Sequence, residues 1–245
     1  MKVGNPYNII TGCIILDKGK VLFSEYNFHE FTDGVTLNDS NGNHIRTVQE
    51  FNPSERSFYD IASFDTNRIA VSIYTCISIV NIDKQNILHK ITSDRRCYGI
   101  THCDGKLYHC SYLEGIRRFD MKIETNQLLI PTDIGEFSYI SCDRNKLFYT
   151  PNTESVNCCD INGKSICRLL DTSLRRSPRG AVVNNQGFVF VAGEQSRNIV
   201  VISPDGNSSK EEYHFSSPRV MCYDKYGNTI LVCNTGRKAF WFQIE

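Results

Sequence analysis

Residues 98–108 read YGITHCDGKLY, which is an apolar run, the dipeptide Asp104-Gly105 and a second apolar run. Asp-Gly between two apolar runs is a strong short-range signal of a β-hairpin. The same arrangement recurs in residues 59–70, YDIASFDTNRIA, and in residues 139–148, YISCDRNKLF. These stretches predict a chain built from repeated hairpins.

The hairpin occurs six times, with further copies in residues 11–23, 178–191 and 218–232. One residue near the centre of each first strand can be taken as equivalent: Cys13, Ile61, Ile100, Ile140, Ala181 and Met221. The spacings between them are 48, 39, 40, 41 and 40 residues. A period close to 40 is typical of stacked or radial repeat proteins.

Each repeat continues after its hairpin with a third apolar run, such as residues 77–82 or 198–203, and then a shorter fourth strand. Four antiparallel strands in about 40 residues, repeated radially, describe one blade of a β-propeller. Helical repeats of similar period would need apolar residues at a 3.6-residue spacing, which is absent. We therefore predict an all-β fold, a six-bladed β-propeller with four antiparallel strands per blade.

The six repeats occupy nearly the whole chain, so residues 1–245 are expected to form a single domain. The blades are expected at approximately 7–50, 57–94, 96–133, 136–174, 177–214 and 217–245. The last repeat ends at residues 240–245, which fill only a third strand. We expect residues 1–6 to complete the last blade, or its fourth strand to be missing, because exchange between the termini avoids two open sheet edges.

Composition argues against several classes of partner. Lys plus Arg and Asp plus Glu each number 27, so no global charge draws the chain to nucleic acid or to an anionic membrane. Neither a signal peptide nor an apolar run of about 18 residues is present. We expect a cytoplasmic protein with no membrane partner.

Eleven cysteines are present, an odd number, and most lie within apolar strand runs. In a cytoplasmic chain we expect all of them to be unpaired. Cys158 and Cys159 are adjacent, so on a strand they point to opposite faces. Both faces of a propeller blade are buried against neighbouring blades, and both thiols are therefore expected in the core.

Zinc-binding residue types are concentrated in one hairpin, at His102, Cys103, His109 and Cys110. If residues 104–105 form a two-residue turn, Cys103 pairs with Lys106 and His102 pairs with Leu107. The two histidines then share one face of the hairpin and the two cysteines share the other. Four ligands cannot converge, and we expect neither a metal site nor a cofactor.

Motifs of common catalytic sites are missing, among them Gly-x-Ser-x-Gly, His-Glu-x-x-His, glycine-rich phosphate loops and Cys-x-x-Cys. Six-bladed propellers resembling gluconolactonases bind an axial metal through carboxylates and amides scattered over several blades. The predicted axial positions of this chain hold hydroxyls and arginines instead of acids. We expect the chain not to be an enzyme, with a metal-dependent propeller hydrolase or lactonase as an alternative.

The residue just before each innermost strand of a propeller lies at one mouth of the central channel. By the repeat register these residues are Thr11, Tyr59, Tyr98, Ser138, Arg179 and Arg219. Arg179 and Arg219 fall on neighbouring blades, so their guanidinium groups are suited to a carboxylate or phosphate of a ligand. The alternative is that each arginine pairs with an acid of the chain, such as Glu136 or Asp94.

Loops that join the second and third strands open on the same face as this mouth. They contribute Tyr26, Tyr74, Tyr112, Asn152, Gln195, Arg197, Asn234 and Arg237, while Arg95 and Arg96 precede the third blade. Aromatic and arginine side chains on one surface are typical of protein-binding hot spots and also of base stacking. The neutral overall charge favours protein over RNA. Exposed tyrosines without a partner are the alternative interpretation.

Three segments, residues 97–107, 177–193 and 200–206, resemble the NHL repeat at the C-terminus of tripartite-motif ubiquitin ligases. The likeness is greatest to the divergent versions of molluscs and similar invertebrates. It extends over all six repeats, although Asp60 and Val220 stand where the repeat usually has glycine. The zinc spacings and heptads of a RING, B-box or coiled coil are absent, so we expect the recognition end of such a ligase or a shortened relative, monomeric unless an upstream coiled coil exists.

The resemblance implies target recognition by one propeller face. We expect a non-catalytic module that binds a protein or peptide with an anionic group and selects substrates for a ubiquitin ligase. Some relatives bind RNA, and the alternative is therefore sequence-selective recognition of single-stranded RNA.

Overall fold

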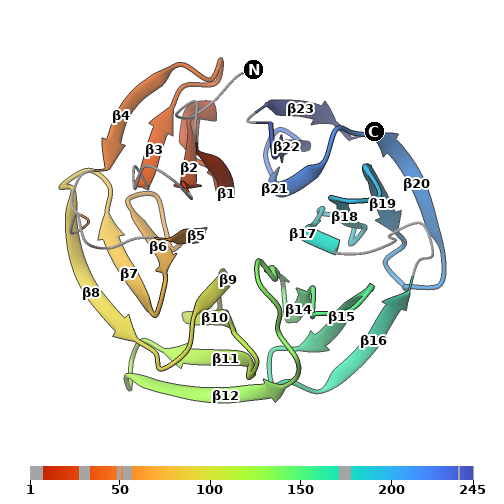
Figure 1. Ribbon diagram of the computed structural model, residues 1–245, viewed down its shortest axis with the longest axis horizontal. Helices are drawn as coiled ribbons and strands as arrows, with labels where there is room; N and C mark the ends of the chain where they lie inside the picture. The colour runs from red at the N-terminus through yellow and green to blue at the C-terminus, as the bar shows by residue number, and fades with distance from the viewer. Residues whose placement is uncertain are drawn as a thin grey trace.

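The computed structural model describes residues 8–27, 34–48, 51, 57–170, 178–236 and 238–244. Six antiparallel sheets are arranged around a central axis (Figure 1). Among the described residues the helical structure is one short 3-10 turn, η1 (Asp17–Gly19), and no helix there is long and apolar enough to span a membrane. The predicted six-bladed, all-β propeller is confirmed.

The first three blades each contain four strands, in sequence order from the axis outward. Blade one consists of β1 (Ile9–Ile15), β2 (Val21–Tyr26), β3 (Gly34–Asn38) and β4 (His44–Val48). Blade two consists of β5 (Phe58–Ser63), β6 (Arg68–Ile73), β7 (Cys76–Asn81) and β8 (Asn86–Thr92). Blade three consists of β9 (Cys97–Cys103), β10 (Lys106–Ser111), β11 (Gly115–Asp120) and β12 (Thr125–Pro131).

Blades four and five repeat this order, and blade six has three described strands. Blade four consists of β13 (Ile140–Asp143), β14 (Lys146–Tyr149), β15 (Ser155–Asp160) and β16 (Ser165–Leu170). Blade five consists of β17 (Pro178–Val183), β18 (Val189–Gly193), β19 (Asn198–Ile202) and β20 (Ser209–His214). Blade six consists of β21 (Pro218–Asp224), β22 (Thr229–Asn234) and β23 (Ala239–Gln243). The predicted contribution of residues 1–6 to this blade lies outside the described residues.

The β9–β10 hairpin shows why local sequence determines the blade. Asp104 and Gly105 have φ angles of 48° and 70°. Positive φ at both central residues is what a type I′ turn requires, and Asp and Gly tolerate it. Cys103 is therefore paired with Lys106, and His102 with Leu107, as predicted.

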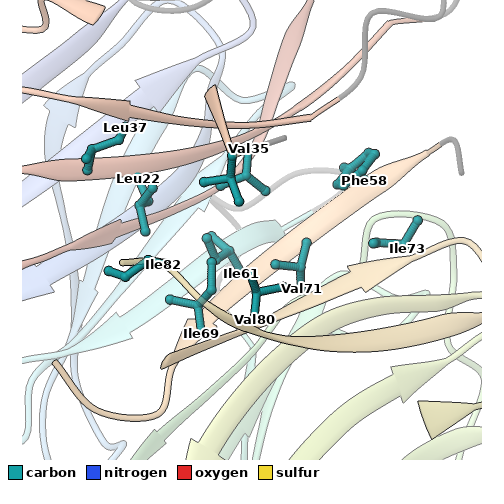
Figure 2. Close-up of a cluster of buried hydrophobic side chains, with 11 residues drawn as sticks. Leu22, Val35, Leu37, Phe58, Ile61, Ile69, Val71, Ile73, Val80 and Ile82 are labelled. Carbon is teal, nitrogen blue, oxygen red and sulfur yellow. The ribbon is translucent and has the colours of Figure 1, made fainter. Parts of the chain in front are cut away.

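Both faces of each blade are buried against neighbouring blades. Figure 2 shows the contact between blades one and two, where Leu22 and Val35 meet Phe58, Ile61 and Val71. Burying an aliphatic or aromatic side chain of this size contributes about 1.5–3 kcal/mol. The contacts between blades are thus the main source of stability of the ring.

The adjacent thiols of β15 show the same two-sided burial. Cys158 packs between blades four and five, and Cys159 packs between blades three and four. Each is 2% exposed, and burial raises the pKa of each thiol to about 12. The predicted placement of these two thiols in the core, on opposite faces of one strand, is confirmed.

The first and last blades pack on each other and so close the ring. Ile10 and Phe23 of blade one contact a cluster that includes Val220, Leu231 and Ala239 of blade six. We call this contact the seam. The innermost strands β1 and β21 lie side by side there (Figure 1). Within the described residues, the seam is held by side-chain packing, without an exchanged strand.

One prediction about the cysteines is wrong. Cys103 at the end of β9 and Cys142 on β13 form a disulfide between blades three and four, with their Cα atoms 6.2 Å apart. The other nine cysteines are not in disulfides. The two residues are 39 positions apart in sequence and become neighbours only where two inner strands converge on the axis. The expectation of unpaired thiols followed from the predicted cytoplasmic location, which the disulfide does not support.

Candidate functional site

The predicted axial residues were expected just before the inner strands, but of the six only Ser138 lies there, two residues before β13. The other five are the second or third residues of their strands. Thr11, Tyr59, Tyr98, Ser138 and Arg219 are buried, and Arg179 is half-buried. The Thr11 hydroxyl donates to the Phe58 carbonyl oxygen at 2.7 Å, and the Ser138 hydroxyl donates to the Gly135 carbonyl oxygen at 3.0 Å. These two hydroxyls therefore tie backbone segments together.

Phe137, which was not among the predicted site residues, lies in contact with the remaining four axial residues. These are Tyr59, Tyr98, Arg179 and Arg219. The ring centroid of Phe137 is 5.7 Å from that of Tyr59 and 5.8 Å from that of Tyr98. The guanidinium carbon of Arg219 lies 4.2 Å from the Phe137 centroid, and that of Arg179 lies 5.7 Å from it. We call these five residues the aromatic mouth. A φ of 57° at Phe137, uncommon for a bulky residue, turns its ring toward this cluster.

Glu194, in the loop after β18, joins the two arginines of the aromatic mouth. Arg179 Nε donates to one carboxylate oxygen at 2.7 Å, and Arg219 Nη1 donates to the other at 3.2 Å. Arg179 Nη1 also donates to the Glu136 carbonyl oxygen at 2.7 Å. The alternative in which the arginines pair with an acid of the chain is thus present in the structure, and the acid is Glu194 instead of Glu136 or Asp94.

An exposed rim lies beside the aromatic mouth, at the ends of blades two and three. The guanidinium carbon of Arg96 is 5.6 Å from the ring of Tyr74 and 5.8 Å from the ring of Tyr112. Arg96 Nη1 also forms an ion pair with Glu136 at 3.0 Å. Tyr74 is 48% exposed. We call Tyr74, Arg96 and Tyr112 the exposed rim, since these side chains are accessible to a partner.

The remaining predicted loop residues divide into three groups. Tyr26 belongs with the mouth, because its ring is 6.0 Å from Tyr59 and 6.5 Å from Phe137. Asn152 donates to the Asp133 carboxylate at 3.1 Å, and the side-chain oxygen of buried Asn234 accepts from the Lys238 amide at 2.8 Å. Arg95, Gln195 and Arg197 are exposed, whereas Arg237 lies outside the described residues.

A small pocket of about 140 Å³ lies next to the aromatic mouth, between blades four and five. Its lining includes Glu136, Asn152, Glu154 and Arg179. Two carboxylates, an amide and a guanidinium surround a space that suits one side chain of a ligand. Ser138, Asn152 and Arg179 were each predicted as binding residues, although the sequence does not show that they share one pocket.

Tyr139 and Asp60 close the central channel below the aromatic mouth. The Tyr139 hydroxyl donates to the Thr11 carbonyl oxygen at 2.8 Å, from blade four to blade one. The Asp60 carboxyl oxygens accept from the amides of Ile61 and Ile100, each at 2.9 Å. Burial raises the pKa of Asp60 to about 8. These side chains, together with the six inner strands, line a cavity of about 200 Å³, which we call the axial cavity.

The histidines of the β9–β10 hairpin are used for packing. His102 stacks on Phe64 with ring centroids 4.1 Å apart. His109 is fully buried, and burial lowers its pKa to about 4. Across the part of the chain that the structure describes, no three His, Cys, Asp or Glu side chains are grouped so that they could hold a metal ion.

No family model and no curated protein matches the sequence. Solved structures do resemble the fold. A protein of unknown function from Bacteroides thetaiotaomicron VPI-5482 has a TM-score of 0.76 at 16% identity, covering 98% of this chain and 72% of its own. Virginiamycin B lyase from Staphylococcus aureus has a TM-score of 0.68 at 15% identity, covering 100% and 87%. A chain of a nidogen/laminin complex has a TM-score of 0.68 at 14% identity, covering 86% and 81%.

The comparison with virginiamycin B lyase corrects one expectation. The lack of catalytic motifs led us to expect that the chain is not an enzyme, yet a protein named for a lyase activity is built on the same fold. Missing motifs therefore do not exclude catalysis here, because propeller sites are assembled from residues far apart in sequence. At these identities the likeness shows the fold alone, a six-bladed propeller.

Proposed function

We propose that the chain recognises a protein partner by binding one of its segments across the exposed rim and the aromatic mouth. The observation that supports this most is the contact of one guanidinium group, that of Arg96, with the rings of both Tyr74 and Tyr112. Tyrosine and arginine are the residues most enriched in binding hot spots. Because the buried aromatic mouth holds this surface in place, little side-chain freedom is lost on binding.

The charges of the site favour a segment with an acidic group at the rim. At the aromatic mouth a ligand carboxylate would have to displace Glu194, which already binds both arginines. At the rim, the acid paired with Arg96 is Glu136, whose side chain is 53% exposed. Exposed ion pairs contribute about 0–1 kcal/mol, so a ligand carboxylate can replace Glu136 at little cost.

Three further observations bear on recognition of a protein. One of the structural neighbours is a propeller solved in a complex of two proteins, nidogen and laminin. The NHL-like repeat pattern suggests the finer role of selecting targets for a ubiquitin ligase. The polar pocket beside Arg179 would hold one side chain of the bound segment.

Affinity capture from the source tissue with matched variants tests this proposal. We expect wild-type chain to retain one or more proteins that the double variant Tyr74→Ala/Arg96→Ala loses. Tyr226→Ala is the control, because Tyr226 is 98% exposed and lies in the β21–β22 hairpin turn, at the opposite end of the inner strands. Equal recovery with the double variant would refute the proposal. Salt-dependent binding of random RNA that the same double variant abolishes would favour RNA instead.

A further inference from the structure

Two free thiols face each other across the seam. Cys13 lies on β1, the first inner strand, and Cys222 lies on β21, the last one. Their sulfur atoms are 3.2 Å apart, although the residues are separated by 209 positions in sequence. The Cys13 thiol donates to the Cys222 sulfur. The first and last blades thus already hold a cysteine pair in contact.

Both thiols also line the axial cavity of about 200 Å³. Cys13 is 4% exposed, whereas Cys222 is half-buried and lies next to Tyr223 and near the exposed Lys225 at the cavity wall. A small reagent that enters the channel at the end where Lys225 lies therefore meets Cys222 before Cys13. The cavity provides the access that most other cysteines of the core lack.

A third thiol, Cys233 on β22, lies close to the pair and is fully buried. Burial raises the pKa of all three thiols, that of Cys222 least strongly. The hydrogen bond from Cys13 opposes the effect of burial on Cys222. Cys222 is therefore the thiol that ionises first and attacks an oxidant, since the thiolate is the nucleophile.

We propose that Cys13 and Cys222 are a modification site, at which a low-molecular-weight disulfide oxidises the pair to a disulfide that closes the propeller covalently. The Cys222 thiolate attacks one sulfur of the reagent, which breaks the reagent's S–S bond and releases one thiol. Cys13 then loses its proton and attacks the Cys222 sulfur, which releases the second thiol. The pair gives up two electrons and two protons, and the reagent is reduced to two thiols.

The position of this bond determines how it would affect the stability of the ring. Neighbouring blades elsewhere in the ring are connected by the chain itself, and blades three and four are also joined by the Cys103–Cys142 disulfide. Blades one and six are connected only through the rest of the molecule. A bond between them constrains a loop that includes most of the chain, and such long loops give the largest loss of entropy in the unfolded state.

Peptide mapping after treatment with oxidised glutathione tests the proposal. The free thiols are alkylated in acid-quenched, denatured protein, and the chain is digested with trypsin without reduction. Cys13, Cys222 and Cys233 fall in different peptides, residues 3–18, 220–225 and 226–237. We expect residues 3–18 to be joined to residues 220–225, with the loss of two of the nine free thiols. Residues 3–18 joined to 226–237, or full alkylation of Cys13 and Cys222, would overturn it.

Thermal unfolding of the same samples tests the closure of the ring. A disulfide of this kind should raise the Tm of wild-type chain by about 5–15 °C. Cys222→Ala should show no such rise, while Cys76→Ala, which removes a half-buried thiol away from the seam, should respond as wild type does. An oxidised wild-type chain with an unchanged Tm would contradict closure.

Discussion

At the scale of single residues, the centre of the propeller depends on alternation between small and large side chains. One position of each inner strand lies close to its counterpart on the next blade. Glycine occupies it in blades one, three and five, and a larger residue occupies it in the blade that follows: Gly12 and Asp60, Gly99 and Tyr139, Gly180 and Val220. A Cβ on Gly12 would lie 2.6 Å from Asp60 Oδ1, and one on Gly99 would lie 2.6 Å from the Tyr139 Cα. Each glycine therefore makes room for its neighbour.

Substitution of Gly99 tests this packing. In Gly99→Ala the new methyl group would lie 2.6 Å from the Ser138 carbonyl oxygen, a backbone atom that cannot move aside alone. We expect the free energy of unfolding in urea to fall by about 2–4 kcal/mol. Gly34→Ala is the matched control, because the nearest atom to its new methyl group is 3.9 Å away. Equal midpoints for the two variants would show that the inner strands are not tightly packed.

Asp60 gives a second prediction at this scale, in the pH dependence of stability. Its pKa is about 8 in the folded chain, above the usual value of 3.8, because the carboxyl group is buried. The stability that it contributes is complete below pH 4 and is lost as the pH rises toward 8. The lowered pKa of His109 acts in the opposite direction, but only below about pH 6.5.

The unfolding free energy of wild-type chain should therefore decrease by about 1–2 kcal/mol between pH 6.5 and pH 8. Asp60→Asn should remove this slope, whatever it does to stability overall, because the amide does not titrate. Urea unfolding at a series of pH values measures it. Measurements stop at pH 8, because above this pH the buried thiols with raised pKa values also make the free energy of unfolding depend on pH. A slope that persists in Asp60→Asn would exclude this carboxyl as its origin.

At the scale of the structural elements, the aromatic mouth is held by loops from different blades. Glu194 follows β18 in blade five, and it binds Arg179 at the start of β17 and Arg219 at the start of β21. The Glu194 and Arg219 side chains are 16% and 7% exposed, so water compensates poorly for a lost partner. We expect Glu194→Gln to lower the free energy of unfolding by about 1–3 kcal/mol.

Glu136→Gln is the control for this prediction. It breaks the ion pair with Arg96, in which the two side chains are 40% and 53% exposed. Removal of such an exposed pair should change stability by less than about 1 kcal/mol. Chemical denaturation of the two variants shows whether Glu194 contributes more to the free energy of unfolding than the exposed Glu136 does. A Glu194→Gln chain as stable as Glu136→Gln would indicate that the arginines of the mouth are already satisfied by other groups.

The elements also show what sequence reasoning can and cannot provide. Turn chemistry and strand alternation are local, and for that reason the Asp104-Gly105 hairpin and the opposite placement of Cys158 and Cys159 were predicted correctly. Glu194 and Phe137 were missed because their roles depend on contacts between blades. The repeat register offered one signal for Phe137, since it directly precedes the axial position Ser138, but a φ of 57° cannot be predicted from the residue type.

At the scale of the whole molecule, stability depends on closure of the ring. Every blade needs two neighbours to bury its faces, and blades one and six, the first and last in sequence, are neighbours in the closed ring. The sequence period is enough to count six blades, but it does not show how strong this last contact is. The seam cluster contains the fully buried Leu231 and Cys233, so its packing resembles that of the other contacts between blades.

A pair of identical substitutions tests whether the seam is as strong as the other contacts. Leu231 at the seam and Leu107 between blades two and three are both 0% exposed. Replacement of either by alanine leaves a cavity and should lower the free energy of unfolding by about 2–5 kcal/mol. If the closed ring unfolds as one unit, both variants keep a single transition in urea with the slope of wild type, because each exposes the same surface on unfolding. An early, separate transition in Leu231→Ala alone would show instead that blades one and six detach first, and that the seam is the weakest contact of the ring.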